Sequence, residues 1–101
     1  MELDYPHSFS ADEAKSRLEA LGKYLQAKHG IAVNWDGSTG RFDGKYLVVS
    51  IQGEFTVEEA MVKLRGKDPG FMWRKKATEY MRHKLDQYLD PSKGLDSLPV
   101  A

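Results

Sequence analysis

The stretch YLVVSIQGEFTV, residues 46–57, carries the strongest structural signal in the chain. Apolar and polar residues alternate along it, which is the period of a β-strand with one buried face. Its apolar parity consists of Leu47, Val49, Ile51, Phe55 and Val57. Gly53 has the same parity and predicts a bulge or bend, because glycine inside a strand often marks one. The segment is therefore predicted to be a strand that faces a core.

A second alternating segment, residues 31–36, lies upstream. Its apolar side consists of Ile31, Val33 and Trp35. The dipeptides Asp36-Gly37 and Asp43-Gly44 favour hairpin turns, so we expect a short strand with Arg41 and Phe42 between them.

Residues 58–66 fit two interpretations. Thr56 and Glu59 could form the capping box of a short helix. The alternation of Ala60, Val62 and Leu64 indicates an edge strand instead. We prefer a tight turn at Glu58-Glu59 followed by a strand, because this strand completes an antiparallel meander.

A helix is predicted before the strands. Ser10 and Glu13 form a capping box, and Gly30 supplies a left-handed C-terminal stop. One apolar stripe consists of Ala14, Leu18, Leu21 and Leu25. The helix is expected to pack on the sheet by this side only.

A second helix is predicted from Asp68 as N-cap and Pro69 in the first turn to about Asp90, before Pro91. Its apolar arc consists of Trp73, Ala77, Tyr80, Met81, Leu85, Tyr88 and Leu89. Its outer side alternates in charge through Lys75, Glu79, Arg82 and Asp86. This pattern favours a solvated structural helix over a nucleic-acid-binding surface, although basic and aromatic residues are interleaved in the sequence.

These elements predict an α+β fold with two layers: a helix, a four-stranded antiparallel meander and a second helix, with both helices on one face of the sheet. Residues 1–90 are expected to form a single domain and residues 91–101 a loose C-terminal tail. Trp35 and Trp73 are both expected to lie between the sheet and the helices.

Composition narrows the function classes. The 101 residues contain 15 Lys and Arg and 15 Asp and Glu, so the excess positive charge typical of duplex-binding domains is absent. There is no cysteine, which fits a reducing compartment. The acidic N-terminal stretch is broken by Pro6 and does not resemble a signal peptide, and no apolar run approaches the roughly 20 residues of a membrane span. We expect a soluble cytoplasmic protein.

No catalytic group of residues emerges, and no metal site or cofactor is expected. His7, His29 and His83 form no pair at helical spacing. His29 is predicted to favour the helix dipole in the last turn, and His83 to lie on the exposed side of the second helix. The role of His7 stays open between a local hydrogen bond and a site.

Scattered positions across residues 5–89 carry a family resemblance: His7, Ser8, Ala14, Gly30 and the stretch WDGSTGRF, residues 35–42, followed by GEFTV at 53–57 and VKLRG at 62–66. The chain resembles the small bacterial polyhydroxyalkanoic acid system proteins of the granule-region type. It departs from them in the basic, aromatic stretch DPGFMWRKK, residues 68–76. The resemblance implies an association with polyhydroxyalkanoate granules or their regulation, without a known reaction or functional residues.

The leading hypothesis is a non-catalytic accessory protein that binds a protein or a polyester granule surface, or associates with itself. Its candidate interaction surface on the uncovered face of the sheet consists of Tyr46, Val48, Met61, Lys63 and Arg65. The alternative is a small nucleic-acid-associated regulator that uses Arg65, Lys67, Arg74, Lys75 and Lys76. A third hypothesis is an enzyme with a pocket between sheet and helices that uses His7. We expect weak or no specific DNA binding.

Overall fold

Five antiparallel strands form one sheet in a computed structural model that describes residues 1–101. The strands pair in the order β1-β5-β4-β3-β2. The elements in chain order are β1 (Glu2–Pro6), α1 (Ala11–His29), β2 (Ala32–Asp36), β3 (Thr39–Tyr46), β4 (Val49–Glu58), β5 (Met61–Gly66), α2 (Phe71–Tyr88) and a 3₁₀ turn (Leu95–Ser97).

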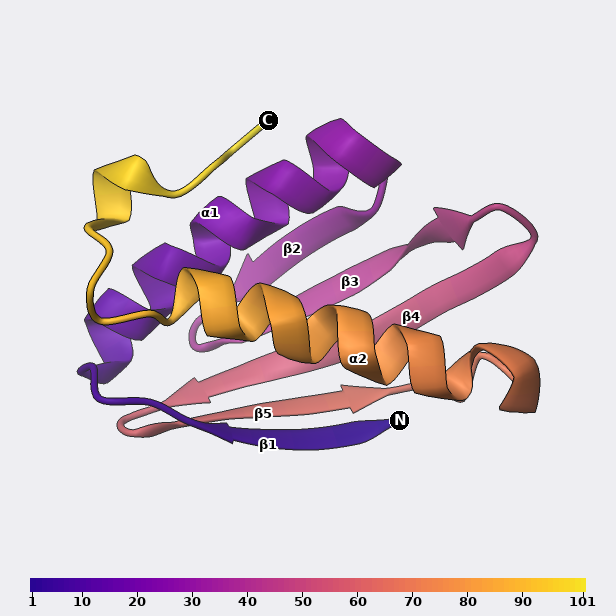
Figure 1. Ribbon diagram of the computed structural model, residues 1–101, viewed down its shortest axis with the longest axis horizontal. Coiled ribbons are helices and arrows are strands. Elements are labelled where there is room, and N and C mark those ends of the chain that lie inside the picture. Colours follow the sequence, from indigo (N-terminus) through magenta and orange to yellow (C-terminus); the bar gives the residue numbers. More distant parts are fainter.

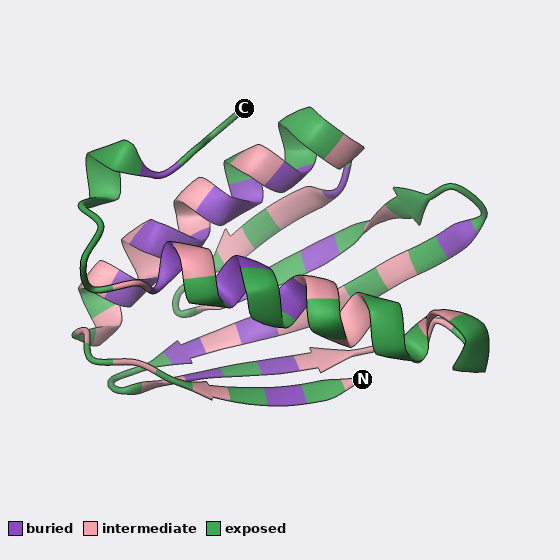
Figure 2. Ribbon diagram, in the orientation of Figure 1, coloured by how far each residue is buried: buried purple, intermediate pink, exposed green.

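Both helices cover the same face of this sheet, as predicted, and make a two-layer α+β domain (Figure 1). The core lies between the layers, and the buried residues of α1 and α2 face the sheet (Figure 2). The predicted stripe of α1 is entirely buried, as are Met81, Leu85, Tyr88 and Leu89 from the predicted arc of the second helix. The sheet contributes Leu3, Phe42, Phe55, Val57, Val62 and Leu64 to the same core.

The prediction of four strands was wrong by one, because residues 2–6 form a further edge strand. β1 pairs with β5, placing Leu3 on the core side and the acidic Glu2 and Asp4 on the outer side. There both carboxylates contact Arg65, at 3.7 and 2.8 Å. The strand is short and ends at a proline, and its partner lies some sixty residues away, so local sequence patterns do not reveal it.

Residues 61–66 form a strand, which confirms the preferred interpretation over a short helix. The turn predicted at Glu58-Glu59 lies one residue later: a two-residue turn at Glu59-Ala60 joins β4 to β5, with Glu58 opposite Met61. Ala60 therefore belongs to the turn and not, as was predicted, to the buried face of the strand. Ala60 adopts a positive φ of 64° in this turn.

The turn predicted at Asp43-Gly44 was wrong. β3 continues through both residues to Tyr46, and the chain reverses at Leu47-Val48 instead. A Cβ atom at position 44 would lie 2.9 Å from the Cα of Ile31, so the glycine permits close packing of a strand rather than a turn. Leu47 adopts a positive φ of 57° and is exposed, which corrects its predicted place in the core.

The helix termini follow the predictions at α1 but not at the start of α2. Ser10 accepts the backbone N–H of Glu13, and Gly30 is left-handed with a φ of 69°. α2 begins at Phe71 after Gly70, so Asp68 is not its N-cap. The Asp68 carboxylate instead accepts the N–H of Gly70 and binds the Arg74 side chain.

The C-terminal residues 91–101 pack on the domain, in contrast with the loose tail that was expected. Leu98 is buried in the core, and the Tyr88 hydroxyl donates to the carbonyl of Pro99. Arg17 holds the segment from α1 through the carbonyl of Lys93. The tail therefore contributes to the same hydrophobic core as the helices and the sheet.

Candidate functional site

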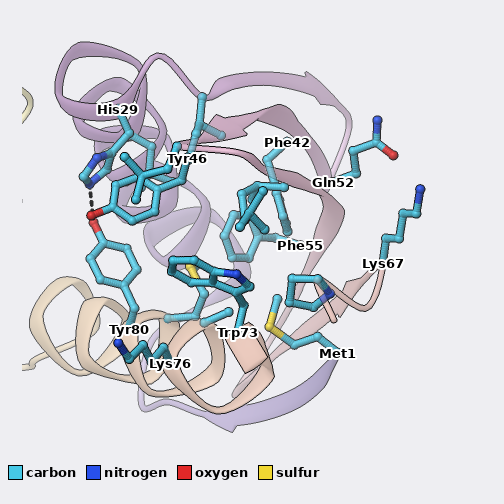
Figure 3. A pocket seen from close by; sticks show the side chains of 18 residues that line it. Met1, His29, Phe42, Tyr46, Gln52, Phe55, Lys67, Trp73, Lys76 and Tyr80 are labelled. Carbon is cyan, nitrogen blue, oxygen red and sulfur yellow. Dashed lines mark hydrogen bonds between the residues drawn. The ribbon is translucent and has the colours of Figure 1, made fainter. Parts of the chain in front are cut away.

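An open, mainly apolar cavity of about 430 Å³ lies between α2 and the sheet (Figure 3). This volume falls within the range of small-molecule sites, roughly 300–1,000 Å³. Thirteen of its eighteen lining residues are hydrophobic, and none is acidic. Its walls include Phe42, Val49, Ile51 and Phe55 from the sheet, Trp73, Ala77, Tyr80 and Met81 from α2, and Leu25, His29 and Ile31 near the end of α1.

The cavity exists because the two layers diverge at this end of the molecule. Residues 44–46 and 49–51 pair only with each other, so they project beyond β2 and β5 as a two-stranded arm, the β3–β4 arm (Figure 1). The first half of α2 lies across from this arm. There the helix presents the small side chain of Ala77 to the cavity, and the Phe42 and Phe55 rings at the floor of the cavity are almost fully buried in the core.

Polar aromatic groups close one end of the cavity. His29 Nε2 shares a hydrogen bond of 3.0 Å with the Tyr80 hydroxyl, and the Tyr46 ring meets His29 edge-on at 5.4 Å (Figure 3). Burial raises the pKa of Tyr80 to about 12, so its hydroxyl stays protonated at neutral pH. Burial, with the charges of Lys28 and Lys84, lowers the pKa of His29. The side chains of His29 and Tyr80 are therefore uncharged at neutral pH, in contrast with the predicted dipole role of a protonated His29.

The lowered pKa of His29 makes stability depend on pH. The unfolded chain takes up this proton near the ordinary pKa of 6.5, before the folded protein does, so acidification favours unfolding. We expect the urea midpoint of the wild type to fall between about pH 7.5 and pH 5.5, and His29→Gln to fall less. The exposed His83→Gln variant serves as control and should follow the wild type. Equal losses in the wild type and His29→Gln would contradict this role.

The predicted basic patch does not form a free cationic surface. Arg65 pairs with Asp4, Arg74 with Asp68, and Lys75 lies 3.9 Å from Glu79. The other two members, Lys67 and Lys76, have no ion-pair partner and line the cavity. They are exposed and flank the labelled ring of Trp73 (Figure 3). The prediction of weak DNA binding stays a prediction.

The candidate interaction surface is not one contiguous surface. Tyr46 pairs with Val49 and lies on the helix side, not on the uncovered face, because paired residues share a face. Met61 pairs with Glu58 at the other end of β4, about 30 Å away at roughly 3.3 Å per residue. The uncovered face is polar, with ion pairs that join Arg41 to Glu54, Lys63 to Glu58, and Arg65 to Asp4.

Exposed apolar side chains gather instead around the cavity mouth. Leu47 and Val48 form the tip of the β3–β4 arm and are 72% and 89% exposed. Phe71 and Met72 open α2 and are 82% and 75% exposed. The arm and the start of α2 lie at the same end of the molecule (Figure 1), and Leu47 and Trp73 line the same cavity. We call these four residues the apolar end. The sequence signal that could have revealed part of this cluster is the adjacent apolar pair Phe71 and Met72, which precedes Trp73 and lies outside the predicted apolar arc of the second helix.

His7 makes local hydrogen bonds and does not line the cavity. Its Nδ1 accepts the N–H of Phe9, so its Nε2 donates to the carbonyl of Glu58. The ring thereby fastens the segment before α1 to the end of β4. A cavity between sheet and helices does exist, but its histidine is His29.

The two tryptophans lie between the layers but are only partly buried. Trp35 covers Gly40, where a Cβ atom would lie 2.8 Å from the indole ring, and packs at the edge of the core. Trp73 lines the cavity. The prediction of their position was correct, while neither indole is fully removed from solvent.

The fold and the cavity define a small two-layer α+β protein with an open apolar site. Over residues 1–91 the chain matches the family described as "Putative polyhydroxyalkanoic acid system protein", and it belongs to this family. The resemblance inferred from scattered positions is thus confirmed. Comparison with curated proteins and with solved structures gave no match. Neither helix has the length and apolar character needed to cross a bilayer.

Proposed function

We propose that this protein is a non-catalytic accessory protein that docks on the surface of polyhydroxyalkanoate granules through its apolar end. The observation that carries the proposal is the exposure of Leu47, Val48, Phe71 and Met72 at the end of the molecule where the cavity opens (Figure 1). The family description supports a role in the polyester system. The proposal implies a cytoplasmic location.

Burial of these side chains against a polyester supplies the driving force. Full burial of one large apolar side chain contributes about 1.5–3 kcal/mol. Partial insertion of four such side chains therefore still favours binding to the polyester surface. Exposed apolar clusters on soluble proteins commonly mark interaction sites. The uncovered face of the sheet offers no comparable surface, since its charges are paired across the strands.

The chemistry of the cavity supports a binding role over a catalytic one. Its lining has a single histidine and no serine, threonine or carboxylate that could act with it. The ring nitrogen of His29 is hydrogen-bonded to Tyr80. His7, the other histidine considered for catalysis, is held by Phe9 and Glu58.

Replacement of the apolar end should abolish docking without unfolding the protein. The variant combines Leu47→Asn, Val48→Ser, Phe71→Ser and Met72→Ser; asparagine is chosen at position 47 because it tolerates a positive φ. We expect co-sedimentation with protein-free polyhydroxyalkanoate particles to fall at least about tenfold, equivalent to 1.4 kcal/mol. Circular dichroism would verify that the fold is retained.

The matched control changes two exposed apolar residues of the C-terminal segment, Leu95→Ser and Val100→Ser, and should sediment like the wild type. Equal sedimentation of the folded fourfold variant and the wild type would contradict the proposal. A wild-type dimer in analytical ultracentrifugation that the fourfold variant converts to a monomer would also contradict it, because the apolar end would then serve self-association.

A further inference from the structure

We propose that the cavity binds an amphiphilic monoanion, namely a carboxylate with an unbranched acyl chain of medium length. The chain lies against the half-buried side chains of Ile51, Trp73 and Ala77, and the carboxylate lies at the mouth beside one of the two lining lysines, Lys67 or Lys76. This inference goes beyond granule docking: it concerns the interior of the cavity rather than the apolar end around it.

The floor of the cavity favours a flexible hydrocarbon. The accessible apolar lining around it includes the half-buried Ile51, Trp73 and Ala77 and the exposed Leu47, and a ligand against these side chains would touch almost only carbon. Each buried methylene of a chain contributes about 0.8 kcal/mol, so affinity should grow with chain length until the cavity is filled.

The charge of the lining selects the head group. Lys67 and Lys76 carry its only charged side chains at neutral pH, and neither has a carboxylate partner in the protein. Met1 also lines the cavity, and its N-terminal ammonium group donates to the carbonyl of Gly66. Lys76 Nζ lies 5.9 Å from the centre of the Trp73 ring, so its charge remains close to the cavity. An anion at the mouth therefore finds an available lysine on either side of Trp73 and no competing acidic side chain.

The hydrogen bond between His29 and Tyr80 orients the ligand. His29 and Tyr80 bond each other, and both side chains are uncharged at neutral pH. These two groups already satisfy each other, whereas the mouth offers lysine side chains and water to a carboxylate. The acyl chain consequently points toward the aromatic end and the carboxylate toward the solvent.

Trp73 provides the measurement, because it lines the cavity. A Trp35→Phe background leaves Trp73 as the sole indole, and its emission would be titrated with decanoate, decanol and acetate. We expect a saturable shift with decanoate, binding at least about tenfold weaker with decanol, equivalent to 1.4 kcal/mol, and no shift with acetate.

Two variants in that background test the two parts of the site. Ala77→Phe fills the cavity and should abolish the shift with decanoate, while Ala27→Phe on the exposed side of α1 should leave it unchanged. Lys67→Gln with Lys76→Gln should weaken decanoate at least about tenfold without affecting decanol. Lys15→Gln with Lys23→Gln removes the same charge from α1 and should have no effect.

An absent or non-saturable decanoate shift would overturn the proposal, as would unchanged affinity in a folded Ala77→Phe variant. Decanol binding as tight as decanoate would overturn the carboxylate assignment. The result is separable from granule docking: Ala77→Phe keeps the apolar end and should still sediment with polyester. Conversely, failure of the wild type to sediment leaves the ligand titration fully interpretable.

Discussion

Arg17→Ala should lower the free energy of unfolding by about 3 kcal/mol, because it removes a buried guanidinium that several backbone carbonyls depend on. Arg17 is only 4% exposed. Its Nη1 donates to the carbonyls of Tyr88 and Asp90 at 3.1 and 3.2 Å, and its Nη2 donates to that of Lys93. The alanine variant leaves these acceptors, at the end of α2 and in the segment after it, without their donor.

The same arginine also joins the start of α1 to the C-terminal segment. Its Nε contacts Glu13 at 3.1 Å, and its guanidinium carbon lies 4.1 Å from the centre of the Phe9 ring. Arg17→Lys should recover little of the lost stability, since one ammonium group cannot reproduce the planar fork of donors.

Urea denaturation followed by circular dichroism measures this effect. Arg41→Ala is the matched control: the Arg41–Glu54 pair is solvent-exposed, with a distance of 3.6 Å, and should contribute less than about 1 kcal/mol. A loss for Arg17→Ala as small as that for Arg41→Ala would contradict the anchoring role.

Gly53→Ala should destabilise the fold by about 3 kcal/mol through steric overlap in the middle of the sheet. A Cβ atom at this position would lie 2.5 Å from the carbonyl oxygen of Arg65 and 2.7 Å from the Cα of Gly66. It would also lie 2.6 Å from Cζ of Phe42, whose ring covers the glycine. Two of these neighbours are backbone, so relief requires the strands to separate.

Thermal and urea unfolding of Gly53→Ala should be compared with Gly94→Ala. Position 94 is exposed, and a Cβ atom there meets only the flexible carboxylate of Asp96 at 3.1 Å. We expect a change within about 0.5 kcal/mol for that control. Wild-type stability of Gly53→Ala would show that β4 and β5 can separate at little cost.

The sequence correctly indicated that Gly53 is a special position in its strand, but the reason predicted for the glycine was wrong. The glycine was predicted to mark a bulge or bend, yet the pairing of β4 with β3 is regular through it, and the pairing with β5 begins at it. Its actual role is to admit the Phe42 ring and the neighbouring backbone. Such a requirement comes from residues that are distant in sequence, so a strand pattern cannot express it.

Local sequence patterns were sufficient to predict most helices and strands and to predict which of their faces is buried. The stripe of α1, the core parity of Val49, Phe55 and Val57, and the strand after Glu58-Glu59 all follow from periods of 3.6 or 2.0 residues. The family was also correctly identified from scattered positions across residues 5–89. These features depend on side chains that are close in the chain.

The candidate site depended on the tertiary structure. Lys67 and Lys76 were grouped with cations that the fold instead pairs with Asp4, Asp68 and Glu79. The sequence by itself determined the helices, the principal strands and the net charge of zero. Only the tertiary structure decided that β1 completes the sheet, that the chain reverses at Leu47-Val48, and that a cavity opens below α2. Each of these requires contacts between segments far apart in sequence, whose free energies local periodicity does not contain.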